Sequence, residues 1–244
     1  RGRGGARLGG PIAKDKAFYF LNVEVARRHD PVLYAPGTNG AQLTSGQASQ
    51  VDQAMKTYAA TAGYAGFNPG NVSTYAIAAN STKLFARLDF KLNDRNSLTV
   101  RDNFVDATAG NLERSAALGK FASADFNHLS TTNGLVAELK SQVGSTGANS
   151  LLLGFSTVSD KREPFAQFGG GTQVAPQVEI VDGSFGQLNL GSDRESVIYR
   201  QKTRTLELTD NYTWVAGDHT FTIGSHNEFY NCLLYTSPSP RDVE

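Results

Sequence analysis

Apolar and polar residues alternate along several stretches of the chain, and the alternation is clearest after Thr82. Every second position there is apolar: Leu84, Ala86, Leu88, Phe90 and Leu92. The positions between them are mostly charged. A period of two predicts a β-strand with one apolar face. The polar sequence Asn93-Asp94-Arg95-Asn96 favours a tight turn, and a second alternating run from Leu98 to Phe104 completes a β-hairpin.

The same unit of two strands and a short turn occurs three more times. The paired strands are expected at Gly4–Ile12 with Ala17–Arg28, Asn133–Gln142 with Asn149–Asp160, and Ser196–Trp214 with His219–Tyr230. The connections between the hairpins are long, covering Arg28–Asn80, Asp106–His128 and Lys161–Glu195. Such loops are uncommon in compact soluble domains, whereas short turns alternating with long loops are typical of membrane barrels. The sequence therefore predicts an all-β fold, a partial antiparallel transmembrane β-barrel of about eight strands with long extracellular loops.

The order of short and long connections also orients the chain. The short turns at Lys14, Asp94, Ser145 and Gly217 are expected to face the periplasm. In the first long loop, Ser45–Ala60 carries apolar residues at helical spacing, namely Val51, Ala54, Met55 and Tyr58. We expect one short loop helix over the barrel mouth, with Ser45 or Ser49 as its N-cap. The rest of the long loops is polar and rich in glycine and predicts no other regular element.

Composition narrows the class of protein. The chain has 244 residues, with 23 Lys and Arg against 23 Asp and Glu, and a single cysteine, Cys232. The neutral balance argues against nucleic-acid binding, and a single cysteine excludes a disulfide framework. No stretch approaches the roughly 18 to 20 consecutive apolar residues of a transmembrane helix. A membrane β-barrel is compatible with this composition, because its alternating apolar and polar faces average to a modest hydropathy.

Two sets of residues are candidates for function in a barrel. Polar residues expected to point into the lumen are Asn22, Glu24, Arg87, Asp89, Arg101, Asn103, Glu138 and Lys140, with Glu207 and Asn227 further along. They would line a substrate path or contact a plug domain, and the alternative is a water-filled wall with mutual ion pairs. Aromatic residues expected as a girdle at the lipid boundary are Tyr19, Phe90, Tyr212, Trp214 and Phe221. The alternative is that aromatic residues are frequent in any strand.

Residues for catalysis or metal binding do not group in the sequence. The histidines His29, His128, His219 and His226 lack ligand spacing, and no HExxH or CxxC pattern occurs. The run Gly169-Gly170-Gly171-Thr172 lacks the following Lys-Ser/Thr of a phosphate-binding loop, which favours a flexible loop. We expect no enzyme activity, no cofactor and no metal.

Several motifs together resemble the barrel of TonB-dependent receptors of the Oar-like group. The segment Leu8–Phe20 is similar to the LGGPI-x-KDK-x-FFF start of that barrel, and Phe85–Asp89 with Ser97–Arg101 is similar to its FARLD…LND…LT-x-R hairpin. Further matches are Val136–Leu139, Thr209–Asn211, Trp214, Gly217, His219–Phe221 and His226–Tyr230. Asp102 departs from the group, which usually has an aromatic residue there, and it lies on the apolar side of its strand without an explanation in the sequence.

The resemblance implies an outer-membrane barrel of about 22 strands with an N-terminal plug, driven by TonB, in a Gram-negative bacterium. Family members take up large or scarce substrates such as siderophores, vitamins, glycans and peptides. The plug and the TonB box precede the barrel in this family, so residues 1–231 are expected to be barrel only. Expected partners are outer-membrane lipid, the TonB complex through that preceding part, and an unknown substrate. Two alternatives remain open: a structural or adhesive outer-membrane barrel that binds a surface partner through its long loops, and a soluble all-β binding domain.

Residues 232–244 break the pattern of the chain. Pro238 and Pro240 are incompatible with a central strand. The segment Cys232–Asp242 resembles a translated transposase-type sequencing adapter, so we expect a non-native tail. A natural Pro-rich end is the alternative.

Overall fold

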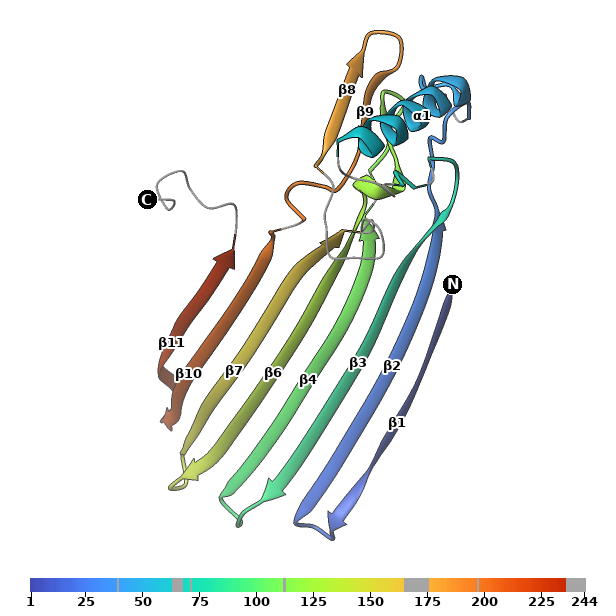
Figure 1. The fold of residues 1–244 in the computed structure, drawn as a ribbon. Coiled ribbons are helices and arrows are strands. Elements are labelled where there is room, and N and C mark those ends of the chain that lie inside the picture. Colours follow the sequence, from blue (N-terminus) through green and yellow to red (C-terminus); the bar gives the residue numbers. More distant parts are fainter. Residues whose placement is uncertain are drawn as a thin grey trace.

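A computed structural model describes residues 1–38, 40–62, 68–70, 72–111, 113–164, 176–196 and 198–235. Eight long strands form one antiparallel sheet (Figure 1). They are β1 (Gly2–Ala13), β2 (Ala17–Pro31), β3 (Ala76–Lys91), β4 (Asn96–Asn111), β6 (Phe126–Val143), β7 (Gly147–Pro164), β10 (Arg200–Ala216) and β11 (His219–Tyr235). The order in the sheet is β1-β2-β3-β4-β6-β7-β10-β11, so each strand pairs with the next long strand along the chain.

The four predicted hairpins are confirmed. Most of their strands are longer than predicted, whereas β10 begins at Arg200 and not at Ser196. The four short turns lie at one end of the sheet (Figure 1). Two of them contain glycine with positive φ, Gly144 at 65° and Gly217 at 59°. In the turn after β3, the Asn93 side-chain oxygen accepts hydrogen bonds from the Arg95 backbone N–H and the Asn96 amide, each at 2.9 Å. Asparagine thus closes a turn without glycine.

The hairpins are offset from one another along the strands. Ala17 pairs with Phe90, yet Ala17 lies two residues from Asp15 in its turn, whereas Phe90 lies four residues from Asp94. The same kind of offset recurs at the pairs Asn96 with Ser141 and Gly147 with Trp214. One to two residues of ~3.4 Å for every two strands, each ~4.8 Å apart, correspond to a strand tilt of about 20–35°. Strands of membrane barrels tilt by about 35–45°.

The three long connections meet at the other end of the sheet and fold together (Figure 1). They contain the helix α1 (Ser45–Thr61), the short strands β5 (Leu118–Lys120), β8 (Val178–Asp182) and β9 (Gly186–Leu190), and the 3-10 helix η1 (Ala122–Ala124). β9 lies between β5, which is parallel to it, and β8, which is antiparallel. We call α1, η1 and this three-stranded sheet the loop module. The expectation of a single regular element in the loops was therefore wrong, because two connections contribute strands too short to show a period.

The predicted loop helix is confirmed, with a different cap and a different inner face. Thr44 is the N-cap: its hydroxyl accepts from the Gln47 backbone N–H, and the Gln47 side-chain oxygen accepts from the Thr44 N–H at 2.9 Å. This capping box replaces the expected caps. Ala48, Val51 and Met55 face the core of the loop module, whereas the expected Ala54 and Tyr58 are exposed. No helix within the described residues has the length and hydropathy needed to span a membrane.

A buried hydrophobic cluster holds the loop module together. Its buried members are Leu43, Ala48, Phe121, Phe185, Leu188 and Leu190, and Val51, Met55, Val72, Val178 and Ile180 pack against them. Leu188 and Leu190 in β9 have no exposed surface. These residues come from all three long connections, so the connections stabilise one another through a shared core.

A substitution at Gly186, the first residue of β9, tests this packing. Its φ is +82°, and a Cβ there would lie 2.3 Å from the Ala117 carbonyl oxygen, which accepts a hydrogen bond from Gln187 N–H at 2.8 Å. Gly186→Ala is expected to destabilise the loop module by about 1–3 kcal/mol, since the new methyl group strains the backbone and breaks the β5–β9 contact. The measurement is hydrogen exchange of the β8–β9 hairpin.

The matched control is Gly183→Ala in the same hairpin, where a Cβ would meet nothing within 4 Å. This variant should exchange like the unmodified protein. Equal protection in the two variants would contradict the close approach at Gly186.

Candidate functional site

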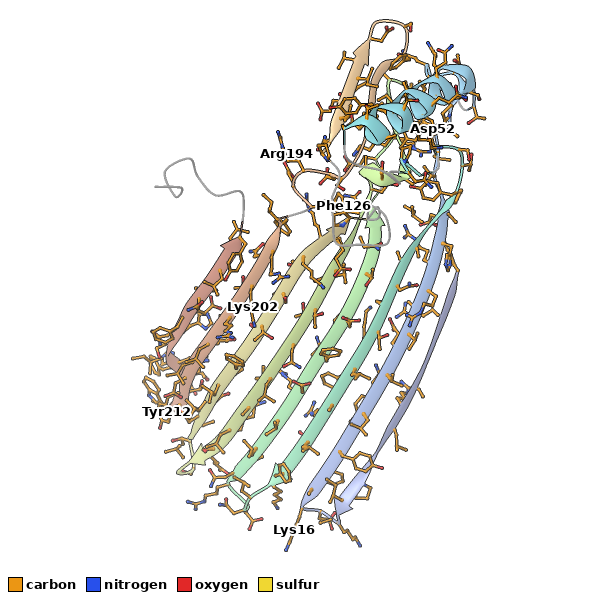
Figure 2. All side chains as sticks on the ribbon, in the orientation of Figure 1. Lys16, Asp52, Phe126, Arg194, Lys202 and Tyr212 are labelled. Atoms are coloured by element: carbon orange, nitrogen blue, oxygen red, sulfur yellow. The ribbon has the colours of Figure 1, made fainter. Side chains whose placement is uncertain are left out.

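The strand register decides which side chains share a face of the sheet, because directly paired residues point to the same side. Arg87 pairs with Arg101, Asp89 with Thr99, and Thr99 with Glu138. Extending these pairs across the sheet places all eight predicted lumen residues on one face, here called the polar face: Asn22, Glu24, Arg87, Asp89, Arg101, Asn103, Glu138 and Lys140. Figure 2 shows their strands running side by side with side chains projecting from the sheet.

The two residues predicted to extend this set lie on different faces. Glu207 pairs with Gly154 and Glu228 and belongs to the polar face. Asn227 pairs with Leu208, and Leu208 pairs with Leu153, so Asn227 lies on the opposite face. The prediction for Asn227 was therefore wrong. The alternation is weak in β11, and only its pairing with β10 identifies the two faces.

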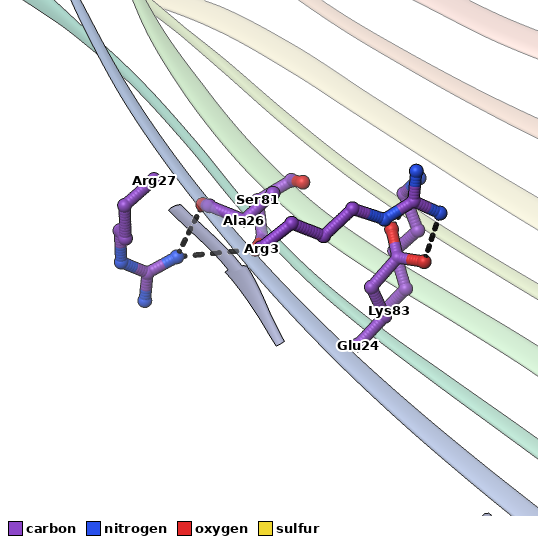
Figure 3. A network of polar contacts seen from close by, with 6 residues as sticks. All are labelled: Arg3, Glu24, Ala26, Arg27, Ser81 and Lys83. Carbon is purple, nitrogen blue, oxygen red and sulfur yellow. Dashed lines mark hydrogen bonds and ion pairs between the residues drawn. The ribbon is translucent and has the colours of Figure 1, made fainter. Parts of the chain in front are cut away.

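Ion pairs bridge neighbouring strands on the polar face. Near the start of the chain, the Glu24 carboxylate binds the Arg3 guanidinium and lies 3.2 Å from Lys83 Nζ (Figure 3). Arg27 projects from the other side of the same strands and donates to the backbone carbonyls of Ala26 at 2.9 Å and Ser81 at 3.1 Å. The β1–β3 part of the sheet is thus tied together by charged groups on both sides.

The pairing continues across the middle of the polar face. Arg87 makes a two-pronged contact with Asp89, with Nη2–Oδ1 and Nε–Oδ2 distances of 2.8 Å, and Thr99 donates to the same carboxylate at 2.8 Å. Lys140 Nζ lies 3.2 Å from Glu138 Oε1. Within the described residues, the Arg101 guanidinium has no hydrogen bond or ion pair. It is the one member of the eight-residue set that offers an unpaired cation on this face.

The opposite face is apolar, and it is exposed because a single sheet has no second layer to cover it. Large hydrophobic side chains there remain more than a third exposed: Leu21, Leu84, Leu88, Leu135, Leu151, Leu153, Phe155, Leu206, Leu208, Ile223 and Phe229. A continuous apolar surface of this extent marks contact with lipid or another apolar partner. We call it the apolar face.

The predicted aromatic residues gather on the apolar face near the short turns. Tyr19 pairs with Leu88, and Phe90 pairs with Leu98, which places both on this side. At the other edge of the sheet, the rings of Tyr212 and Trp214 stack with centroids 5.7 Å apart, and those of Trp214 and Phe221 stack at 5.4 Å. All five girdle candidates therefore lie at one border of the apolar face.

Asp102 is a carboxylate on the apolar face, and Asp210, which pairs with Leu151, is another. Asp102 pairs with Leu135, and the neighbouring Asn133 donates its amide to both carboxylate oxygens at 3.1 and 3.2 Å. The amide partially compensates a carboxylate on an otherwise apolar surface. The sequence held no signal for this pair, because the two residues lie 31 positions apart.

A buried polar cluster joins the loop module to the sheet. Asp125 has no exposed surface, and the Tyr75 hydroxyl donates to its Oδ2. Burial raises the pKa of the Asp125 carboxyl to about 9, so this group is neutral at pH 7. Arg114 donates to the Lys120 carbonyl oxygen at 2.6 and 3.0 Å and lies 5.6 Å from the Tyr75 ring centroid. Burial lowers the pKa of its guanidinium to about 10.

Sequence reasoning missed this cluster. Its residues come from two different long connections and follow no spacing that identifies buried polar groups. Within the described residues, Asp125 Oδ1 and the Ser192 hydroxyl are buried without a hydrogen-bond partner. Ser123 is buried beside them and accepts from the Gly191 N–H at 2.9 Å.

A cavity of about 280 Å³ opens beside α1 in the first long connection, where surface recognition was expected. Ser45, Ser49, Asp52 and Lys56 line its helical side, and Phe121 lies beneath it. Asp52 and Lys56 form an ion pair at 2.8 Å. A second hollow, of about 600 Å³, lies at the turn end of the polar face and includes Lys91, Asp94 and Lys140. Both hollows present hydroxyl and charged groups suited to polar ligands.

The described residues contain no group of three or more His, Cys, Asp or Glu side chains that could hold a metal ion. His128 and His226 each lie near carboxylates, on separate strands. Cys232 is exposed and forms no disulfide. The glycine run at 169–171 lies outside the described residues, so its predicted loop conformation stays a prediction.

Comparison with known proteins agrees with this architecture. A family model described as an outer membrane beta barrel domain matches residues 31–241. No curated protein matches the sequence significantly. The crystal structure of the outer membrane transporter YddB from Escherichia coli is similar, with a TM-score of 0.56 and 8% sequence identity over 94% of this chain. The chain spans 25% of the length of that structure. At this identity the similarity concerns the fold, and it matches our sheet to a quarter of a larger barrel.

Proposed function

Because the chain belongs to the outer membrane beta barrel domain family and resides in the bacterial outer membrane, we propose that it forms part of a TonB-dependent transporter for a large or scarce substrate. The observation that carries this proposal is the sheet itself, with one exposed apolar face and one ion-paired polar face. Such a sheet is stable when lipid covers the apolar side and a closed barrel protects its edges. Barrels and transporters of this kind are typically not enzymes.

In this proposal the polar face lines the barrel lumen and the aromatic border is the girdle at the periplasmic boundary. The loop module then faces the cell surface, and its cavity beside α1 is the place for first contact with a substrate. Most charges of the lumen wall neutralise one another, which keeps the wall hydrated without holding a substrate tightly. Arg101 is available for an anionic group of the substrate or of a plug.

The barrel would contain about 22 strands, and a plug would fill a lumen of that size. Energy coupling would come from the TonB complex, bound through a segment that precedes the barrel. Residues 1–231 would then be barrel and residues 232–244 a non-native tail. Sequencing of genomic DNA across position 231 tests the last point, since an in-frame genomic copy of the tail would contradict it.

Binding to TonB tests the transport proposal. The protein from the complete reading frame, purified in detergent, is expected to bind the purified periplasmic domain of TonB. A version shortened to the barrel should lose this binding, because the contact lies before the barrel. A complete protein that fractionates with the outer membrane but does not bind TonB would contradict the proposal.

The loop module gives an adhesive outer-membrane barrel some support as a second function. Its connections share a buried core rather than forming separate loops, and a folded surface unit suits a stable partner contact. In that case, deleting the loop module would abolish attachment to a surface, and the complete protein would not bind TonB.

A further inference from the structure

Three basic residues form a row on the apolar side of β10. Arg200, Lys202 and Arg204 alternate with Gln201 and Thr203, so all three project from the side that carries Leu206 and Leu208. Each of the three is exposed. Within the described residues, none of their side chains has a hydrogen bond or an ion pair. We call these three residues the basic row.

The height of the basic row follows from the register and the tilt. Arg204 lies ten residues from Trp214 along β10. Ten residues of ~3.4 Å in a strand tilted by about 20–35° rise by roughly 28–32 Å. The apolar band of membrane barrels is about 25 Å tall. If Trp214 marks one border of the band, Arg204 lies at the other border, and Lys202 and Arg200 lie beyond it in the headgroup layer.

The neighbouring strands leave the basic row unneutralised. Lys202 pairs with Ser159 and Arg204 with Thr157 on β7, and neither partner is acidic. On β11, the partners of Arg200, Lys202 and Arg204 are Tyr235, Leu233 and Asn231, which are not acidic either. Arg200 pairs with another cation, Lys161. The Lys161 Nζ lies 2.5 Å from Glu163 Oε1, so the acid on this part of β7 is already paired. The border therefore carries a local excess of positive charge, although the chain as a whole is neutral.

We propose that the basic row binds phosphate groups of the phosphorylated glycolipid in the outer leaflet of the outer membrane. The inference rests on the proposed orientation, in which the loop module faces the cell surface. Arginine binds phosphate through two parallel hydrogen bonds, and lysine adds a point charge. Successive residues of the row lie ~7 Å apart along the strand, so they can bind neighbouring phosphates. The apolar belt below would hold the acyl chains of the same lipid.

The test uses the complete protein in detergent, with diphosphorylated lipid A as the probe and native mass spectrometry as the readout. The triple variant Arg200→Gln, Lys202→Gln, Arg204→Gln is expected to bind the probe about a hundredfold more weakly. The matched control removes three positive charges at the turn end, as Lys14→Gln, Lys16→Gln, Arg95→Gln. The control should retain binding, because those residues would face the periplasm.

Heat-modifiable gel migration confirms that each variant is folded, and the single variant Lys202→Gln replaces the triple one if the latter does not fold. Replacement of both arginines by lysine keeps the charge and should retain most of the binding. Unchanged affinity in the glutamine variant, or an equal loss in the turn-end control, would overturn the proposal. TonB binding is measured on the same preparations and should not respond to either set of changes, so failure of the lipid site and failure of the transport function are distinguishable.

Discussion

Replacing Phe121 by alanine is expected to unfold the loop module while the eight long strands stay paired. Phe121 is 1% exposed and contacts the cluster that includes Leu188 and Leu190. Truncation of a buried phenylalanine costs about 3–5 kcal/mol through lost burial and a residual cavity. A core of this size provides little stability beyond that amount. In hydrogen exchange of the outer-membrane protein, α1, β8 and β9 should lose protection, and β6 and β7 should keep it.

Val181→Ala is the matched control, because Val181 lies in β8 but is 77% exposed. Its truncation removes little buried surface and should leave exchange unchanged. If Phe121→Ala exposed the β6 and β7 amides as strongly as those of α1, the loop module and the sheet would form one cooperative unit. That outcome would contradict the separate core described above.

Raising the pH is expected to destabilise the junction between the loop module and the sheet. Burial raises the folded-state pKa of Asp125 from about 3.9 in an unfolded chain to about 9. Between these two values the folded state holds a proton that the unfolded state releases, so stability falls as the pH rises. The slope for one proton is at most about 1.4 kcal/mol per pH unit. Exchange of the β9 amides between pH 5 and pH 8.5, corrected for intrinsic exchange rates, measures it.

Asp125→Asn keeps an oxygen that can accept from the Tyr75 hydroxyl and removes the titration, so its module should show no such slope. Asp182 provides an opposite control. The Ser184 hydroxyl and backbone N–H bind its carboxylate and lower its pKa, so its contribution is present above the ordinary pKa and is lost as the pH falls. Asp182→Asn should leave the alkaline destabilisation intact. A pH response unaffected by Asp125→Asn would assign the effect to another group.

The long strands could be predicted from the sequence because the polarity of each residue indicates the face of the sheet on which it lies. A strand that separates lipid from water needs apolar residues on one side and polar residues on the other, and β3 shows this from Leu84 to Phe90. The short turns follow from Asn, Asp and Gly at the hairpin tips. The eight residues of the polar face were found in the same way, because their strands alternate clearly.

The polar–apolar alternation predicted residues wrongly, or missed them, where it is weak and where contacts link distant segments. Asn227 lies in a strand whose polar and apolar residues mix, so only its pairing with Leu208 identifies its face. The N-cap at Thr44 was missed because Ser45 and Ser49 are equally good caps by residue type. Its partner Gln47 distinguishes Thr44 through a specific geometry.

The sequence by itself determined the hairpins, their turns and the division of the sheet into an apolar and a polar face, because these depend on residues two positions apart. Only the tertiary structure decided how the long connections pack, since β5, β8 and β9 are too short to show a period and become strands by pairing with one another. The same holds for Asp125, whose neutral state results from burial by segments distant in the sequence. The basic row of β10 combines both: its residues alternate visibly in the sequence, but the register and the strand tilt place them at the border of the apolar band.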